Sequence, residues 1–404
     1  MTELLELKQR ADYTHKYNTE SGRHGWLRLT PAYSVKVVEE ILANYNSEGR
    51  VLDPFCGSGT TALCSARRGL PAATTDINPF LIWLATVKTK SYSANDIAAT
   101  LRASGEILDA MGKVFPAVAP PPIHNIERWW SSRSLTFLCQ LKGAIEGIEC
   151  SKKVKDLLLV AFCRTLIKIS NAAFNHQSMS FKEGNAELDL SIDRAAIFKD
   201  DVLHILEGCR EEIRSDVSVK LQDARHLEPA TLGKFDLVIT SPPYANRMSY
   251  IRELRPYMYW LGYLHEAREA GELDWQAIGG TWGVATSRLN DWSASEEYQN
   301  DHLSSVVTTI SQAENKHAET LSRYVHKYHE DIYSHLSSLT GLLNKEARVH
   351  YIIGNSTFYG TLVSVEDLYA DMMKKVGFSN INIKAIRKRN SKKELVEFDV
   401  SATW

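Results

Sequence analysis

The sequence predicts an α/β fold: a sheet of about seven strands that ends in an antiparallel hairpin and is interrupted by a helical insertion. Three observations carry this prediction. The segment RVLDPFCGSGTTALCSARRGL has the order strand, glycine turn, helix, which is typical of a parallel α/β unit. Short apolar runs bounded by turn residues recur further along the chain. The last two runs flank the basic segment KRNSKK and predict the hairpin.

The elements follow in chain order. A helix-like stretch at 30–45 precedes the first strand, which ends at Asp53. The later strands are expected at 72–75, 217–221, 235–240, 348–353, 381–386 and 395–400. Apart from the helix after the glycine turn, helices are expected at 94–114, 132–149, 152–170, 192–214, 321–343 and 365–376. Residues 266–316 are polar, carry tryptophans and show no clear period, so this second insertion is expected to be irregular.

Composition excludes several classes of protein. The 404 residues are 44% hydrophobic, and no apolar run approaches the roughly 18 residues needed to span a bilayer. The first residues, MTELLELKQR, lack the features of a signal peptide, which predicts a cytoplasmic protein. Six cysteines without a CxxC pair argue against a disulfide framework or a zinc site, and no metal is expected. The net charge of −2 neither favours nor excludes a nucleic-acid partner, which needs only a local basic face.

Gly57 and Gly59 lie between a predicted strand and a predicted helix. Glycine there lets the backbone turn tightly and approach a ligand, and the helix that follows offers unpaired N–H groups. The segment lacks the lysine of a triphosphate-binding loop. It also lacks the third glycine of the dinucleotide fingerprint, because position 62 is alanine.

Three aspartates follow predicted strands and have alternative explanations. Asp76 is placed to reach a ribose diol, or else caps the Asn78-Pro79 turn. Asp223 is placed to accept from an adenine amino group, or else is an exposed loop acid. Asp53 either faces the amino group of a ligand or holds the glycine loop.

The segment TSPPY, at 240–244, ends another predicted strand. Proline cannot donate to a sheet ladder, so the strand stops there, and two prolines make a stiff loop. Open α/β sheets bind their ligands at the carboxyl ends of their strands, so one ligand could touch this loop, the glycine turn and the acidic residues.

These motifs together resemble those of the amino-group-specific DNA methyltransferases, which use S-adenosylmethionine. D-P-F-C-G-S-G-T-T is similar to their cofactor motif and T-S-P-P-Y to their catalytic motif, while H-G-W-L-R-L-T-P-A-Y resembles their N-terminal cofactor element more loosely. The resemblance covers about 20–90, 217–262 and 320–404, and covers 90–215 poorly. It implies a Rossmann-like methyltransferase sheet with S-adenosylmethionine as the cofactor.

The resemblance also implies the site. The cofactor would contact Asp53, Phe55, Gly57, Gly59, Thr60, Asp76, Asp223 and Ala224, with Asp76 on the ribose and Asp223 on the adenine. The catalytic loop would be Ser241, Pro242, Pro243 and Tyr244. A nucleobase amine is a poor nucleophile, and the Ser241 hydroxyl and Pro242 carbonyl are suited to accept its hydrogens. Tyr244 would stack on the base, which must be flipped out of the duplex. Catalysis of this kind needs no metal and no covalent intermediate.

Serine at position 241 favours one acceptor. In this family S-P-P-Y is more often associated with N4 of cytosine and D-P-P-Y with N6 of adenine. The expected reaction is therefore methylation of N4 of cytosine in DNA, with N6 of adenine as the alternative. Methylation at C5 needs a cysteine nucleophile in a Pro-Cys motif, whereas Cys56 lies inside the glycine turn.

The family implies double-stranded DNA as the partner, with one flipped base, and a restriction–modification system with a cognate restriction endonuclease. The candidate phosphate contacts are basic residues after the catalytic loop and in the hairpin: Arg247, Arg252, Arg255, Arg387, Lys388, Arg389, Lys392 and Lys393. Arg247, Arg252 and Arg255 could instead pair with Glu253 and its neighbours, and the hairpin cluster could be a solvated turn.

Five regions follow. Residues 1–90 would hold the N-terminal element and the cofactor-binding half, 216–264 the catalytic half, and 321–404 the C-terminal part of the methyltransferase domain. The helical insertion at 91–215 and the irregular one at 265–320 are both candidates for target recognition, and the helical one could instead be a structural cap.

Three other functions compete. The loop motif of an RNA guanine-N2 methyltransferase would resemble D-P-P-Y more than the S-P-P-Y found here. A nucleic-acid-binding module without activity would not need the complete motif set. A nicotinamide oxidoreductase has no use for S-P-P-Y, which offers nothing to hydride transfer.

Overall fold

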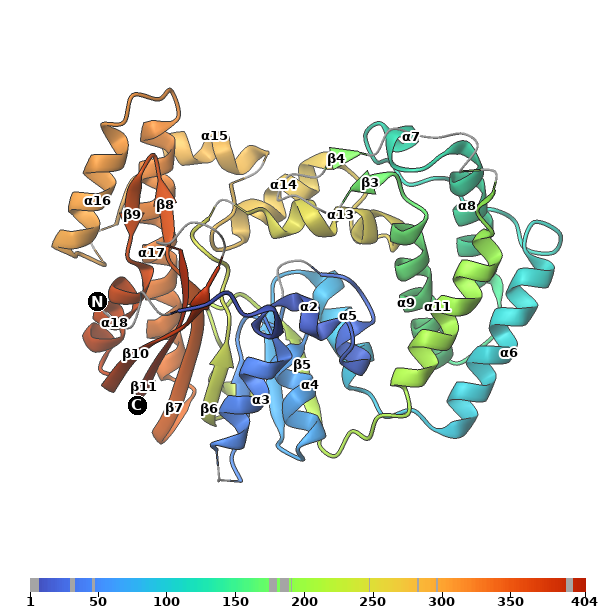
Figure 1. The fold of residues 1–404 in the computed structure, drawn as a ribbon, viewed down its shortest axis with the longest axis horizontal. Coiled ribbons are helices and arrows are strands. Elements are labelled where there is room, and N and C mark those ends of the chain that lie inside the picture. The colour runs from blue at the N-terminus through green and yellow to red at the C-terminus, as the bar shows by residue number, and fades with distance from the viewer. Residues whose placement is uncertain are drawn as a thin grey trace.

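The computed structural model describes residues 7–29, 33–45, 48–173, 180–181, 189, 191–246, 248–281, 283–295, 297–389 and 395–404. Its centre is a seven-stranded sheet in the order β10-β11-β7-β6-β1-β2-β5, as the sequence predicts for the fold class (Figure 1). The strands are β1 Val51–Asp53, β2 Ala72–Asp76, β5 Val217–Leu221, β6 Phe235–Thr240, β7 Leu343–Gly354, β10 Ser379–Lys388 and β11 Val396–Thr403. The five strands from β7 to β5 are parallel, and β11 and β10 form the antiparallel hairpin.

Helices surround this sheet and extend to one side of it (Figure 1). Their bounds are α2 His15–Asn18, α3 Val35–Ala43, α4 Thr60–Arg67, α5 Pro79–Thr89, α6 Ala94–Ala110, α7 Ile126–Trp129, α8 Ser132–Gly147, α9 Lys152–Lys168, α11 Arg194–Gly208, α12 Pro229–Leu232, α13 Tyr250–Trp260, α14 Ala267–Gln276, α15 Val284–Asp291, α16 Asp301–Ser311, α17 Ala318–Thr340 and α18 Val365–Val376. The 3-10 helices are Ala11–Tyr13 and Gly22–Gly25, and two short ribbons pair β3 Ala172–Ala173 with β4 Ser180–Phe181 and β8 Ser356–Phe358 with β9 Thr361–Val363.

The order of the strands creates a switch point next to β1. From β1 the chain proceeds to β2 and β5 on one side, and then returns to β6 and β7 on the other. The loops that leave the carboxyl ends of β1 and β6 therefore diverge to opposite sides of the sheet and leave a crevice between them. These two loops are the glycine turn and TSPPY.

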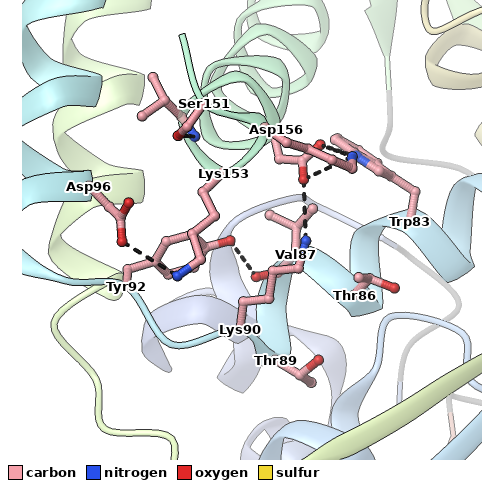
Figure 2. A network of polar contacts seen from close by, with 12 residues as sticks. Trp83, Thr86, Val87, Thr89, Lys90, Tyr92, Asp96, Ser151, Lys153 and Asp156 are labelled. Atoms are coloured by element: carbon pink, nitrogen blue, oxygen red, sulfur yellow. Dashed lines mark hydrogen bonds and ion pairs between the residues drawn. The ribbon is translucent and has the colours of Figure 1, made fainter.

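The helical insertion lies beside the sheet on the right of Figure 1, where α6, α8, α9 and α11 pack together. Their apolar side chains belong to one core that also contains Leu84 of α5 and Tyr257 of α13. Polar contacts close the junction (Figure 2). Asp156 of α9, 3% exposed, accepts from Trp83 Nε1 of α5 at 3.1 Å and from Lys152 Nζ at 3.0 Å, and Lys90 Nζ lies 3.5 Å away.

The prediction that 266–316 is irregular is wrong. The region holds three helices of 8 to 11 residues, α14, α15 and α16. Each presents only a few apolar residues, such as Leu303, Val306 and Ile310 of α16, so its period is easily hidden among polar and turn residues. The sequence analysis also missed α5, which Asn78 caps by accepting from Phe80 N at 3.0 Å.

The remaining predicted elements are present, most of them with shifted ends, and the helix at 365–376 has the predicted bounds. Strands 217–221 and 235–240 have the predicted bounds, whereas β7 and the hairpin strands are longer than predicted. In the part of the chain that the structure describes, no helix combines the length and hydrophobicity that crossing a bilayer requires.

Candidate functional site

A cavity of about 850 Å³ lies at the carboxyl ends of the central strands. Its walls come from the glycine turn, from the ends of β2, β5 and β6, and from α13. Seven residues that the sequence analysis selected line it: Phe55, Gly57, Asp76, Asp223, Ala224, Ser241 and Pro243. The end of α14 and the loop after it close one side with Gln276, Ala277 and Ile278, so part of the second insertion belongs to this cavity.

The two glycines of the turn have different roles. Both adopt positive φ, 49° at Gly57 and 77° at Gly59. A Cβ atom at Gly59 would lie 3.2 Å from the Cβ of Ala85, so Gly59 lets α4 pack against α5. At Gly57 the nearest atom to such a Cβ would be 3.8 Å away, and this residue borders the open cavity. Thr60, the first residue of α4, is buried.

Asp76 serves the cavity and the turn together. Its Oδ2 accepts from Gly57 N at 3.0 Å and its Oδ1 accepts from Asn78 N at 2.9 Å. Burial raises the pKa of Asp76 to about 6, against the effect of these hydrogen bonds. The carboxylate caps the Asn78-Pro79 turn, as one of the two sequence-based alternatives expects, and it also lines the cavity.

Asp53 lies behind the turn, 1% exposed. Its Oδ1 accepts from Thr240 Oγ1 at 2.6 Å and from Phe55 N at 3.1 Å, which links the end of β6 to the glycine loop. Its Oδ2 has no hydrogen-bond partner among the described residues. Burial raises the pKa of Asp53 to about 7. Asp53 thus holds the loop from behind, and it does not itself line the cavity.

Asp223 is already engaged by Arg225. Arg225 Nη2 donates to Asp223 Oδ2 at 2.7 Å and Arg225 N donates to Oδ1 at 2.9 Å. Burial opposes ionisation of Asp223, and these hydrogen bonds overcome it, so its pKa is lowered. Arg225 also donates to Asp331 Oδ1 at 2.9 Å and to the Gln276 carbonyl at 2.7 Å. It therefore connects the loop that carries Asp223 to the end of α14, which borders the cavity.

Helix α17 positions three parts of the site, which the sequence analysis did not anticipate. Tyr328 donates from its hydroxyl to the Pro243 carbonyl at 2.9 Å. His335 is buried between the Ala224 carbonyl, 2.9 Å from Nδ1, and the Tyr351 hydroxyl, 2.7 Å from Nε2. Burial lowers the pKa of His335 to about 4, so the ring is neutral at pH 7. The helical spacing of Tyr328, Asp331 and His335 is the only signal that relates them in the sequence.

A second cavity, about 1350 Å³, opens beside the first. The N-terminal segment lines it with Arg10 and Lys16, the SPPY loop with Ser241 and Tyr244, and the hairpin with Arg387, Lys388 and Arg389. Ser241 and Tyr250 line both cavities, so the two meet at these residues.

Ser241 uses its only hydroxyl proton internally, because Oγ donates to the Ile352 carbonyl of β7 at 2.9 Å. The oxygen lone pairs remain, so toward the cavities Ser241 is an acceptor. Pro242 is buried, and Pro243 is fixed by Tyr328.

Tyr244 is held by the C-terminal hairpin. Its hydroxyl donates to Glu397 Oε1 at 2.9 Å, and the guanidinium carbon of Arg389 lies 4.7 Å from the ring centroid. Burial and the charge of Glu397 raise the pKa of Tyr244 well above its usual value, so the phenol stays protonated.

The predicted phosphate contacts have different surroundings. Arg255 packs over the ring of Trp129, 5.3 Å from its centroid, toward the helical insertion and not toward either cavity. Arg252 is half-buried on α13. Arg387 pairs with Glu397 and Arg389 with Tyr244, while Lys388 lines the second cavity. Arg247, Lys392 and Lys393 lie outside the described residues.

All six cysteines are free thiols, and burial raises the pKa of Cys56, in the glycine turn, well above the ordinary range. Among the described residues, no group of three or more His, Cys, Asp and Glu side chains could hold a metal ion.

No family model matches the chain. It is 24% identical over 351 residues to Type II methyltransferase M.MvaI of Kocuria varians, a match covering 81% of this chain and 74% of that protein. It is 22% identical over 299 residues to Type II methyltransferase M.BsoBI of Geobacillus stearothermophilus, covering 65% of this chain and 57% of that protein. The solved rRNA methyltransferase aviRa of Streptomyces viridochromogenes matches 93% of this chain and 87% of that chain at 12% identity, with a TM-score of 0.30 that is too low to describe a shared fold. The two sequence relatives support a methyltransferase.

Proposed function

We propose that this protein is a DNA methyltransferase of a restriction–modification system that transfers a methyl group from S-adenosylmethionine to N4 of cytosine. The relatives, both named Type II methyltransferases, support methyl transfer and DNA as its acceptor. The observation that carries the proposal is the position of Ser241, an acceptor at the junction of the two cavities.

The first cavity fits S-adenosylmethionine. Gly57 leaves room for a ligand against the backbone, and Asp76 and Asp223 are carboxylates on its walls. Asp53 does not line this cavity and would support it from behind, by holding the glycine turn through the Phe55 N–H. S-adenosylmethionine, when bound, supplies an activated methyl group. The chain would bind it through the turn and the acidic residues and exclude water with the loop after α14.

The second cavity would take the acceptor base. The nitrogen of an exocyclic amine is a poor nucleophile because its lone pair is delocalised into the ring. Ser241 Oγ would accept one of its hydrogens, because its own proton is committed to the Ile352 carbonyl. Tyr244 supplies an aromatic face on which a flipped base would stack. Serine at 241, as in S-P-P-Y, supports cytosine N4 over adenine N6.

Tritium-labelled S-adenosylmethionine and genomic DNA from a host without DNA methylation test the proposal. We expect methyl transfer to this DNA, and N4-methylcytosine in its nucleoside digest. Ser241→Ala should lower kcat about 100-fold or more with cofactor affinity unchanged, because one preorganised contact to the reacting group is lost. Ser305→Ala, at an exposed position of α16, is the matched control.

Three results would contradict parts of the proposal. N6-methyladenine in the digest would show that the acceptor base is adenine and not cytosine. Methyl transfer to RNA but not to DNA would show that the substrate is RNA. Full activity of Ser241→Ala would show that the Ser241 hydroxyl is not needed to accept a hydrogen from the base.

A further inference from the structure

The side chain of Tyr244 is oriented by residues far away in the sequence. Its hydroxyl donates to Glu397 Oε1 of β11 at 2.9 Å, and Arg389 lies over its ring at 4.7 Å. Its backbone N–H donates to the Tyr250 hydroxyl at 3.3 Å. The loop SPPY supplies the residue, and the hairpin fixes the plane of its ring.

Glu397 is a buried acid in this arrangement, 4% exposed. Its charge is balanced by Arg387, which donates from Nε to Oε2 at 2.8 Å and from Nη2 to Oε1 at 3.0 Å. The two residues are direct neighbours across the β10–β11 ladder. A buried carboxylate without a partner is strongly unfavourable, so removing Arg387 from this pair would be costly.

This geometry conflicts with Arg387 and Arg389 as free phosphate ligands. Arg389 donates from Nη1 to the Asn355 carbonyl at 2.8 Å while its guanidinium covers Tyr244. If a phosphate bound Arg387 and drew it away, the Glu397 carboxylate would remain buried without its charged partner. Both arginines are therefore used within the acceptor site.

We infer that Glu397 is a positioning residue: supported by Arg387, it fixes the ring of Tyr244 so that the face not covered by Arg389 receives a planar acceptor. The inference rests on the proposed function for the identity of that acceptor, a nucleobase. It assigns the Glu397 carboxylate no proton transfer and no contact with the base. Its effect passes through the Tyr244 hydroxyl alone.

A double-mutant cycle tests this assignment. Tyr244→Phe and Glu397→Ala should each lower kcat/KM for methyl transfer to unmethylated genomic DNA about 10-fold, because a charge-assisted hydrogen bond is lost. In the Tyr244→Phe background, Glu397→Ala should cost less than about 2-fold, because the contact is already absent. Glu397→Gln, whose amide oxygen still accepts, should recover most of the activity. Equal losses from Glu397→Ala in both backgrounds would overturn the inference.

A second measurement needs no substrate. In protein labelled with 3-fluorotyrosine, Tyr244→Phe identifies the ¹⁹F resonance of Tyr244 among the 17 tyrosines. Glu397→Ala should shift and narrow that resonance because the ring is released, whereas Lys384→Ala, exposed on the neighbouring strand β10, should leave it unchanged. An unchanged resonance in Glu397→Ala would contradict the inference. A wild-type protein inactive on DNA would contradict the proposed function and leave this test of the inference intact.

Discussion

Asp53 shows how one residue can connect stability with the site. Its carboxylate ties β6 to the glycine loop through Thr240 and the Phe55 N–H, yet one oxygen is buried without a described partner. Burial raises its pKa to about 7 because the charged form is poorly solvated. The folded protein therefore keeps a proton on Asp53 over a range in which the unfolded chain has lost it.

This proton gives stability a defined pH dependence. Below about pH 4 Asp53 is protonated in both states, and the protonated form is the one the fold favours. Between about pH 4 and 7 the unfolded chain releases the proton more readily, so the contribution of Asp53 to stability falls as pH rises. Asp53→Asn should thus gain stability relative to the wild type across this window, by up to about 4 kcal/mol.

Urea unfolding at a series of pH values measures the effect. The difference between Asp53→Asn and wild type should rise from pH 4 to pH 7 and then level off. Asp291→Asn, at an exposed position, serves as the control. A difference that is constant over this window would show that Asp53 is ionised in the fold.

At the scale of the element, α17 acts as the scaffold of the site. One helix fixes the SPPY loop through Tyr328, the loop after β5 through His335, and Arg225 through Asp331. Because a helix is rigid, these contacts keep the carboxyl ends of β5 and β6 in a fixed relation. The loops that line the first cavity are therefore held in place before a ligand binds, which reduces the cost of ordering the site.

The junction of α5 with α9 is a second element-scale feature (Figure 2). Replacing Asp156 with alanine would leave the indole N–H of Trp83 without its acceptor and separate Lys90 and Lys152 from their shared carboxylate. We expect a loss of about 2 kcal/mol in the free energy of unfolding, most of it from the unsatisfied Trp83 donor, since Lys152 is largely exposed. Glu106→Ala, exposed on α6, is the control.

Denaturant unfolding followed by tryptophan fluorescence and by circular dichroism checks this prediction. The shared core of α5, α9 and α13 favours coincident transitions for the two probes in the wild type. An Asp156→Ala variant as stable as the wild type would contradict the role assigned to the network.

At the scale of the whole molecule, Arg23 joins three distant segments. It is fully buried and donates to the carbonyls of Lys88 at 2.7 Å, Gly208 at 2.8 Å and Glu211 at 3.1 Å. The N-terminal segment, the end of α5 and the end of α11 therefore meet at one guanidinium. This residue therefore links the end of α11, in the helical insertion, to α5 and to the N-terminal segment.

Arg23→Met should cost about 3 to 5 kcal/mol in the free energy of unfolding, because several buried carbonyls lose a charged donor at once. Chemical denaturation of the variant measures the loss, with Arg133→Met, exposed on α8, as the control. If the free energy of unfolding of the variant lay within about 1 kcal/mol of the wild-type value, as for a surface substitution, water would have replaced the guanidinium as the donor.

Much of the site follows from local sequence. A strand, a glycine turn and a following helix are specified by neighbouring residues, so Gly57, Asp76, Asp223 and Ser241 were placed at strand ends and indeed line one cavity. The short helices α14 to α16 were missed because few apolar residues mark their buried faces.

Tertiary structure decided the rest. The strand order and its switch point beside β1 depend on which strands pair, and pairing joins residues far apart in the chain. Tyr328 and Glu397 reach the SPPY loop from positions 85 and 153 residues away from their partners. These contacts form only when distant segments pack together, so no pattern of neighbouring residues predicts them. The motifs, in contrast, depend on backbone geometry over a few consecutive residues.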